Sequence, residues 1–280
     1  MNDKIRTFKL KFRRFRYLIK WFFENHFNQI KPYLNYRELD SKSIKKSLIL
    51  APHADDEWIG NSQILSKTFS TVYYFQFLGN NYSESNKTTR RKELENLQKK
   101  INFDLILSDN YEDYSDLENL ILTQNFSDIF IPFPIDWHQE HIKVNTILYD
   151  VLVKVDKKIN LKFYHISVPF AEESEGCFLP ITKKELIEKN NIFSKIYQSQ
   201  YNTPIRRLNF QQRLNAKGFK YYALENYLEL DFEEWTDLLT YIENNYETNI
   251  KKMIFSIDNL TEIRRLSNQV YTDWKLSQIK

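Results

Sequence analysis

The chain has 280 residues, of which 42% are hydrophobic and 28% charged, as is usual for a globular protein with a sizeable core. A single cysteine excludes an intramolecular disulfide framework and a cysteine-based zinc finger, and it favours a cytoplasmic protein. The net charge of +3 is local, because residues 1–20 hold eight Lys or Arg against one Asp and the remaining residues therefore sum to −4.

The first predicted element is a basic amphipathic helix near the N-terminus. Its apolar positions recur at spacings of three and four, with lysines and arginines between them: Ile5, Phe8, Phe12, Phe15, Ile19 and Phe22. Residues 4–23 therefore suit peripheral contact with an anionic membrane, where each basic side chain contributes about 1 kcal/mol. The same stripe could instead pack on the protein's own core or on a partner subunit, and the sequence leaves both open. Nucleic acid is not expected as a partner, since no other part of the chain extends the basic surface.

From residue 45, short apolar runs alternate with helical patterns. We predict strands at 47–51, 72–78, 104–108, 128–133 and 161–168, and helices at 59–69, 87–101, 115–125 and 139–155. This alternation implies parallel pairing with right-handed crossovers, hence a Rossmann-like three-layer α/β fold with a mainly parallel sheet. The ligand site of such a sheet lies beyond the carboxyl ends of its strands. No glycine-rich dinucleotide or phosphate loop follows these strands, so a nucleotide is not expected there.

After about residue 180 the pattern becomes mainly helical, and the last 50 residues predict a helical extension. We therefore divide the chain into an N-terminal basic amphipathic arm at 1–44, a central domain at 45–230 and a helical C-terminal extension at 231–280. No uninterrupted apolar run approaches the roughly 18 residues that cross a bilayer. We expect a cytoplasmic protein, in which any contact with a membrane would be limited to its surface.

The most unusual stretch is PHADDE, residues 52–57, directly after the strand predicted at 47–51. His53 and Asp56 lie three residues apart at a strand-to-helix turn, where an imidazole and a carboxylate can meet at one point, and both are good zinc ligands. Asp55 lies between them and would face the same cavity without binding the metal, which is the position of a general base. A purely structural turn would hold three adjacent acids with no compensating charge nearby in the sequence, which is the weaker explanation.

A second cluster follows the fourth strand of the central domain, in the stretch PFPIDWHQEH. It contains Asp136, His138, Glu140 and His141. His138 and His141 are spaced i, i+3 at a predicted helix start and so share one face. One of them can complete a three-ligand site with His53 and Asp56 while the other faces the reacting group, and the spacing does not decide which. Two imidazoles and a carboxylate leave an open position on a zinc ion, as catalytic sites do.

Two other residues carry weaker signals. His165 falls inside the fifth predicted strand and is expected to be a core residue rather than a ligand. Cys177 follows that strand at the expected rim of the site, but it has no base beside it in the sequence. Neither belongs to the candidate site.

At these motifs the sequence resembles the PIG-L/LmbE-like N-acetylglucosaminyl deacetylase family. PHADDEWIG is similar to the family's P-H-P-D-D-E-x-x-G, HQEH to its H-x-D-H, and RRKELENLQKKI to its R-x-x-E helix at Arg90 and Glu93. KIYQSQ and GFKYYALENY are similar to later family segments, so the resemblance covers about residues 46–230. The sequence departs from the family pattern at three places. Ala54 replaces the usual Pro, and Glu140 replaces the usual Asp. Asn61 and Ser62 stand where smaller residues are usual, and they could narrow the site.

The resemblance implies a role for each residue of the two clusters. It makes His53, Asp56 and His141 the metal ligands, Asp55 the general base and His138 an electrophilic helper. Asp136, Glu140 and Arg90 would hold these groups in place or contact the substrate, and the longer Glu140 would change how the neighbouring histidine is oriented. The implied cofactor is zinc (Zn2+), which iron or another divalent metal could replace.

The resemblance also implies the reaction. We expect a metal-dependent hydrolase that removes the N-acetyl group from an N-acetylated amino sugar, free or lipid-linked, in glycan or glycolipid biosynthesis. A thiol-sugar conjugate or an antibiotic intermediate is an alternative substrate. A non-catalytic, membrane-associated subunit that keeps the fold is an alternative of a different class, and a purified protein without stoichiometric metal would favour it.

Overall fold

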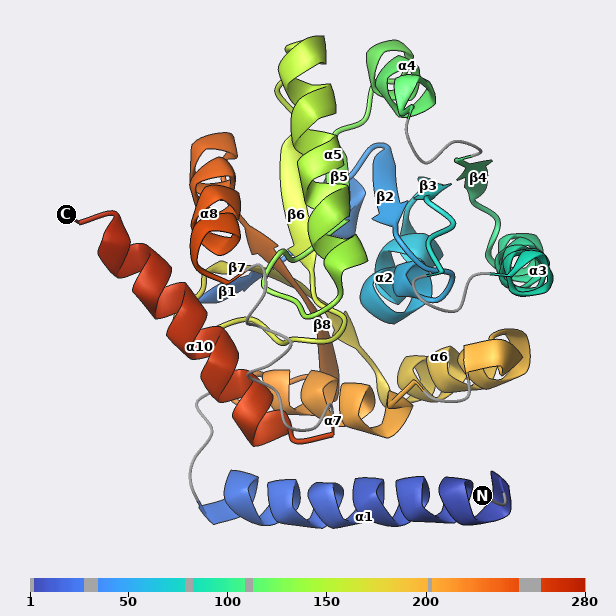
Figure 1. Cartoon of the computed structure of the whole chain (residues 1–280), viewed down its shortest axis with the longest axis vertical. Coiled ribbons are helices and arrows are strands. Elements are labelled where there is room, and N and C mark those ends of the chain that lie inside the picture. The colour runs from blue at the N-terminus through green and yellow to red at the C-terminus, as the bar shows by residue number, and fades with distance from the viewer. Residues whose placement is uncertain are drawn as a thin grey trace.

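A computed structural model describes residues 3–27, 35–78, 83–108, 113–200, 203–246 and 258–279. Its centre is an eight-stranded sheet with helices packed on both faces, so the expected three-layer α/β arrangement is confirmed (Figure 1). The strand order is β1 (Tyr36–Glu38), β7 (Gly176–Ile181), β8 (Ala223–Glu229), β6 (Asn160–Tyr164), β5 (Asp128–Pro132), β2 (Ser47–Ala51), β3 (Ser70–Tyr74) and β4 (Asp104–Leu107). Every pairing is parallel except those of β8, which runs antiparallel to both of its neighbours.

The five strands predicted from the sequence are present as β2 to β6. Two of the predictions ran too far, because β3 ends at Tyr74 and β6 at Tyr164, after which the chain leaves the sheet. β1, β7 and β8 were not predicted from the sequence, and they form one end of the sheet beyond β6. β8 is the strand that makes the sheet mixed rather than fully parallel.

The helices form two layers, each with its own hydrophobic core. α2 (Asp56–Lys67), α3 (Glu84–Ile101), α6 (Lys183–Ile196) and α7 (Ile205–Asn215) contribute to the core on one face. α4 (Ser115–Thr123), α5 (Gln139–Val155), α8 (Phe232–Asn245) and α10 (Leu260–Ser277) contribute to the core on the other. Alternate side chains of β2 enter the two cores, Leu48 and Leu50 on the second face and Ile49 on the first, as expected of a central parallel strand buried on both sides.

The centre of the sheet contains the topological switch point. From β2 the chain builds β3 and then β4 on one side, and it returns to build β5 and then β6 on the other. β2 and β5 are therefore neighbours in space, with Ser47 opposite Asp128 and Ile49 opposite Phe130. Ligands of open α/β sheets bind beyond the carboxyl ends of the strands at such a point. Both polar clusters found in the sequence begin there.

α2 lies unusually close to the sheet because of Gly60. A Cβ atom at this position would lie 2.3 Å from Cδ2 of Tyr164, which is far inside van der Waals contact. The Tyr164 ring is fully buried, and its hydroxyl donates a hydrogen bond to the carbonyl of Leu50 at 2.7 Å. Gly60 thus allows the helix that follows PHADDE to pack directly on a fixed aromatic ring.

The predicted N-terminal helix is present as α1 (Asp3–Phe27), which runs along one end of the molecule beside α7 and α10 (Figure 1). Trp21 is only 3% exposed and packs on Phe210 of α7, with ring centroids 3.7 Å apart, and on Leu214 and Leu260. The opposite face of α1 carries six apolar side chains that are 42–69% exposed: Phe8, Phe12, Phe15, Ile19, Phe22 and Phe23. The side chain of Ile5 lies outside the described residues. None of the helices in the described ranges combines the length and apolarity that crossing a membrane requires.

Candidate metal centre

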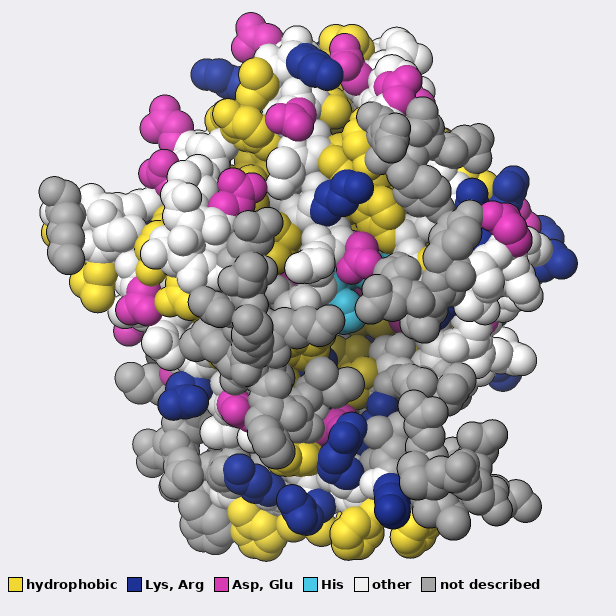
Figure 2. All heavy atoms as spheres, in the orientation of Figure 1, with side chains coloured by type: hydrophobic (Ala, Val, Ile, Leu, Met, Phe, Trp, Pro, Cys, Tyr) yellow, Lys and Arg dark blue, Asp and Glu magenta, His cyan; other side chains and the backbone are white. Residues whose placement is uncertain are grey.

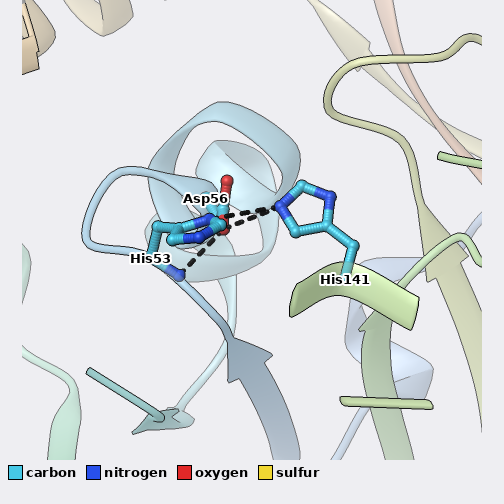
Figure 3. A group of neighbouring side chains, drawn as sticks. All are labelled: His53, Asp56 and His141. Atoms are coloured by element: carbon cyan, nitrogen blue, oxygen red, sulfur yellow. Dashed lines mark hydrogen bonds and ion pairs between the residues drawn. The ribbon is translucent and has the colours of Figure 1, made fainter. Parts of the chain in front are cut away.

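Three side chains meet at the switch point: His53, Asp56 and His141 (Figure 3). His53 lies in the turn after β2, Asp56 is the first residue of α2, and His141 lies in the first turn of α5, which follows β5. His53 Nδ1 is 3.1 Å from Asp56 Oδ2, and His141 Nε2 is 3.3 Å from both of these atoms. Two segments almost 90 residues apart in sequence therefore supply one compact set of donors.

This triangle of donor atoms has the dimensions of a metal site. Ligand atoms about 2.0–2.1 Å from a tetrahedral zinc ion lie about 3.3–3.4 Å from one another. The three observed separations of 3.1, 3.3 and 3.3 Å are close to this value. The side chain of His53 is 21% exposed whereas those of Asp56 and His141 are almost fully buried, so the site is accessible from the His53 side. Histidine atoms are visible there at the molecular surface (Figure 2).

The charges around the triangle also favour a cation. Asp55, Asp56, Glu57 and Asp136 are all buried. Burial alone would lower the pKa of His141, but the carboxylates of Asp136 and Asp56 outweigh it and raise that pKa to about 10. Burial would likewise raise the pKa of Asp56, but His141 and His53 hold it well below its usual range. The site thus stabilises positive charge at the point where the three donors converge, which fits a divalent metal ion.

Asp136 holds the ring of His141 through a hydrogen bond. Its Oδ2 lies 3.0 Å from His141 Nδ1, and since Nε2 faces the other two donors, Nδ1 is the nitrogen that donates. Oδ2 also accepts from the backbone N–H of Ser167 at 3.4 Å, and Oδ1 accepts from that of His138 at 3.0 Å. Glu140, expected to influence the neighbouring histidine, is half-buried and makes no hydrogen bond to either histidine among the residues that the structure describes. Among the described residues, the carboxylate that contacts His141 from its Nδ1 side is therefore Asp136 and not Glu140.

Asp55 has a strained backbone at the N-terminus of α2. Its φ of 130° lies in the region that residues with a side chain rarely adopt, and such strain is concentrated at functional sites. Oδ2 accepts a hydrogen bond from the Thr203 hydroxyl at 3.3 Å. Burial, together with the charges of Asp56 and Glu57, raises the pKa of Asp55 well above its usual value, although Arg90 and Thr203 oppose the shift. A raised carboxyl pKa is what a general base needs if it is to take up a proton near neutral pH.

The turn that carries Asp55 is held by residues remote in sequence. The backbone N–H of Asp55 donates to Glu57 Oε2 at 3.1 Å, and Glu57 Oε1 in turn accepts from the Tyr197 hydroxyl. Gln200 Nε2 donates to the carbonyl of Ala54 at 3.0 Å. Tyr197, Gln200 and Thr203 were not identified as site residues from the sequence, although KIYQSQ, which contains the first two, was one of the segments that suggested the resemblance.

The R-x-x-E helix has a clear place in this arrangement. Arg90 Nη1 approaches the carbonyl of Ala54 to 3.5 Å. Glu93, one turn further along α3, accepts from the backbone N–H of Ser199 at 2.7 Å and from its hydroxyl at 2.6 Å. One helix thus touches the metal-site turn and fixes the segment at 197–200 that packs on it.

His138 caps α5 at the edge of the triangle. Its ring centroid is 5.7 Å from that of His53 and 5.0 Å from that of His141. Burial, with the charge of His141 nearby, lowers the pKa of His138 to about 4. A neutral imidazole at this position can still donate an N–H hydrogen bond to an oxygen that acquires negative charge.

The remaining residues singled out in the sequence lie away from the triangle. His165 follows the last residue of β6, is half-buried and packs edge-on against Phe170, and it does not belong to the group of three possible ligands found among the described residues. Cys177 is buried inside β7 rather than placed at the rim of the site. Ser62 donates to Glu225 at 2.6 Å. A separate cavity behind α2 is lined by Trp58, Gly60, Lys189 and Glu225 among others, and none of the three ligands lines it.

Comparison with known proteins gives the fold independent support. No protein-family model matches the chain, and no curated protein matches it. Among solved structures, the chain is similar to N,N'-diacetylchitobiose deacetylase from Pyrococcus horikoshii in complex with an inhibitor, with a TM-score of 0.53 and 15% identity over 75% of this chain and 93% of that one. It is also similar to a deacetylase of the pseudoaglycone of the antimicrobial reagent A40926, with a TM-score of 0.51 and 14% identity over 66% of this chain and 97% of that one. The chain therefore has the fold of these deacetylases, as the resemblance predicted.

Proposed function

We propose that the chain is a metal-dependent N-deacetylase of the PIG-L/LmbE type that removes the acetyl group from an N-acetylated amino sugar. The observation that carries this proposal is the triangle formed by His53, Asp56 and His141 at the switch point of the sheet. The similar solved structures support the chemistry, because their described substrates are diacetylchitobiose and an antibiotic pseudoaglycone.

The reaction divides between a metal ion and the residues around it. A divalent ion such as Zn2+ held by the three donors would supply positive charge for the acetyl carbonyl and would acidify the attacking water. Asp55 takes one proton from that water as the new C–O bond forms, and it delivers the proton to the amide nitrogen as the C–N bond breaks. The products are acetate and the free amino sugar. Burial suits Asp55 to this exchange because it raises the carboxyl pKa.

His138 and Arg90 assist without binding the metal. The His138 imidazole donates an N–H hydrogen bond to the carbonyl oxygen as negative charge develops on it. This role is supported by the position of its ring, which lies beside those of His53 and His141. Arg90 holds the backbone of the turn through Ala54 and faces Asp55 with a positive charge.

The finer part of the proposal concerns the substrate and its location. A lipid-linked amino sugar in a cytoplasmic glycan or glycolipid pathway fits best, because α1 presents exposed aromatic side chains beside basic ones. A thiol-sugar conjugate or an antibiotic intermediate is the second candidate, and the pseudoaglycone deacetylase among the similar structures favours it.

Acetate release tests the activity directly. The purified chain is assayed against N-acetylglucosamine, diacetylchitobiose, a lipid-linked N-acetylglucosamine and an N-acetylated thiol-sugar conjugate, with and without a chelator. We expect chelator-sensitive release from at least one sugar. Asp55→Asn should keep the metal and lose turnover, whereas His53→Ala should lose both.

A matched variant controls for the loss of a carboxylate elsewhere. Asp104→Asn makes the same change at an exposed position. Asp104 is the first residue of the outermost strand β4, whereas the candidate site lies beyond the carboxyl ends of the central strands. This variant should retain full activity. Near-normal turnover in Asp55→Asn would refute its assignment as the base, and purified protein without stoichiometric metal would favour the non-catalytic subunit.

A further inference from the structure

α1 is attached to the protein by one face and leaves its apolar face exposed. At about 100° per residue, Trp21 lies on the side of the helix opposite Phe8, Phe12 and Phe15. Trp21 is buried against α7 and α10, whereas these three phenylalanines are 56–69% exposed. Within the part of the chain that the structure describes, the stripe therefore does not pack into the hydrophobic core. An exposed apolar row of this length on an anchored helix marks a contact surface.

The basic side chains of α1 are divided between two tasks. Arg13 and Arg14 form ion pairs with Asp258, at 3.1 and 3.4 Å, and these contacts hold the helix against the protein. Lys9, Lys11 and Arg16 are exposed and form no ion pair within the described part of the chain. On the helical wheel they flank the aromatic stripe on both sides. Figure 2 shows the result at the lower edge of the molecule, where apolar side chains stand in a row beside lysines and arginines.

We propose that this face of α1 docks the protein on the surface of an anionic lipid membrane. The helix lies parallel to the surface, with Phe8, Phe12, Phe15 and Ile19 inserted among the acyl chains. The unpaired basic groups on both flanks reach up to the headgroups, which is the arrangement of interfacial helices. Trp21, Arg13 and Arg14 face away from the lipid and transmit the attachment to α7 and α10.

Charge complementarity selects a lipid surface over a second copy of the chain. Two α1 stripes packed on each other would bring their flanking lysines and arginines together, and like charges at close range oppose association. An anionic surface instead neutralises them, and each basic side chain near it adds to the attraction. The partner of this surface is therefore a phospholipid bilayer rich in acidic headgroups.

Flotation with vesicles tests the proposal without reference to deacetylase activity, so it can fail or succeed independently of the proposed function. The full chain is mixed with vesicles of equimolar phosphatidylcholine and phosphatidylglycerol, and with vesicles of phosphatidylcholine alone. We expect binding to the anionic vesicles. Raising NaCl from about 0.1 M to about 1 M shortens the screening length from about 10 Å to about 3 Å and should weaken the binding.

Two sets of variants separate the apolar and the charged contributions. Phe12→Ser with Phe15→Ser should lower partitioning by about a hundredfold, whereas Val153→Ser with Ile187→Ser, which changes equally exposed residues of α5 and α6, should not. Lys9→Gln, Lys11→Gln and Arg16→Gln together should lower it by about tenfold or more. The same charge loss at Lys99, Lys100 and Lys184 should have little effect. Thermal melting checks that every variant is folded.

Three results would overturn the proposal. One is a wild-type chain that does not float with the anionic vesicles. Another is equal loss of binding in the phenylalanine variant and in its control. The third is a dimer in sedimentation velocity that Phe12→Ser with Phe15→Ser converts to monomer while lipid binding is absent, since the stripe would then meet a second copy of the chain.

Discussion

Asp136→Asn should weaken metal binding without changing any ligand. The carboxylate accepts three hydrogen bonds, with Oδ2 facing His141 and Ser167 and Oδ1 facing His138. Asparagine has nearly the same shape but only one oxygen. In either orientation of the amide, its NH2 group therefore faces an N–H donor that forms a hydrogen bond with the carboxylate of Asp136 in the wild-type protein, and that hydrogen bond is lost.

The size of the effect follows from these contacts. Loss of the partner that orients a ligand histidine typically costs 10–100-fold in metal affinity, which is about 1.4–2.7 kcal/mol. The variant also removes the negative charge that, with Asp56, favours a cation at His141. A buried N–H left without an acceptor costs about 1–3 kcal/mol more in folding stability. We therefore expect weaker zinc binding together with a lower melting temperature of the metal-free protein.

Competition with a chromophoric chelator measures the zinc Kd, and thermal melting in excess chelator measures the stability of the metal-free chain. Asp104→Asn serves as the control because Asp104 is exposed and begins β4, the outermost strand of the sheet, away from the candidate site. A Kd for Asp136→Asn within about twofold of the wild-type value would show that Asp136 does not orient His141 for a metal. A changed Kd in the control would show that net charge alone is responsible.

Three further outcomes follow from the same structure. Gly60→Ala should destabilise the fold by about 1–2 kcal/mol in thermal melting, since overpacking against Tyr164 costs more than alanine gains in a helix; an unchanged or higher melting temperature would contradict the close packing. Trp21→Ala should increase hydrogen exchange of the α1 amides while Phe12→Ala leaves it unchanged; equal exchange in both variants would contradict the anchor. Zinc at about 100 times its Kd should stabilise the chain by about 2.7 kcal/mol relative to chelator, and identical melting curves would argue against a metal site.

The centre of the sheet was predictable because its signals are local. β2 and β5 are short apolar runs that are followed within a few residues by the polar clusters beginning at His53 and Asp136, and α5 begins and ends where the helical pattern does. The group of possible metal ligands could be anticipated because the chain has only five histidines and three of them follow two strands. The sequence spacing left open which of His138 and His141 joins His53 and Asp56, and among the described residues it is His141 whose ring nitrogen lies close to both.

The end of the sheet beyond β6 could not be predicted from the sequence. In particular, its strand β8 has no local signal of a strand. Its sequence ALENYLE is rich in residues common in helices, and its polar side chains Glu225 and Asn226 are buried. Apart from the hydroxyl of Tyr227 in the same strand, the partners of Glu225 are distant: it accepts from Ser62, from the backbone N–H of Gln63 and from Lys189. Long-range contacts of this kind decide the strand, and no spacing within the segment reports them.

The same limit applies to the support of the general base and to α1. Thr203 is 148 positions from Asp55, and its contact depends on the fold of the whole domain. In α1 the spacing of the phenylalanines revealed one face, but the single Trp21 that anchors the other face leaves no periodic pattern. The sequence therefore could not decide whether the phenylalanine stripe of α1 packs inward or faces solvent, and the structure was needed to show that it faces solvent.

The topology of the central strands also ties the metal site to the completion of folding. After β2 the chain forms β3 and β4 on one side of β2, and only then does β5 pair with β2 on the other side. The segment that carries His53 and the segment that carries His141 therefore meet only when β2 and β5 have paired. A misfolded chain could keep both motifs intact and still have no place for an ion. A metal ion held by His53, Asp56 and His141 would bind only to chains in which these segments have come together, and it would therefore selectively stabilise chains whose central strand pairing is correct.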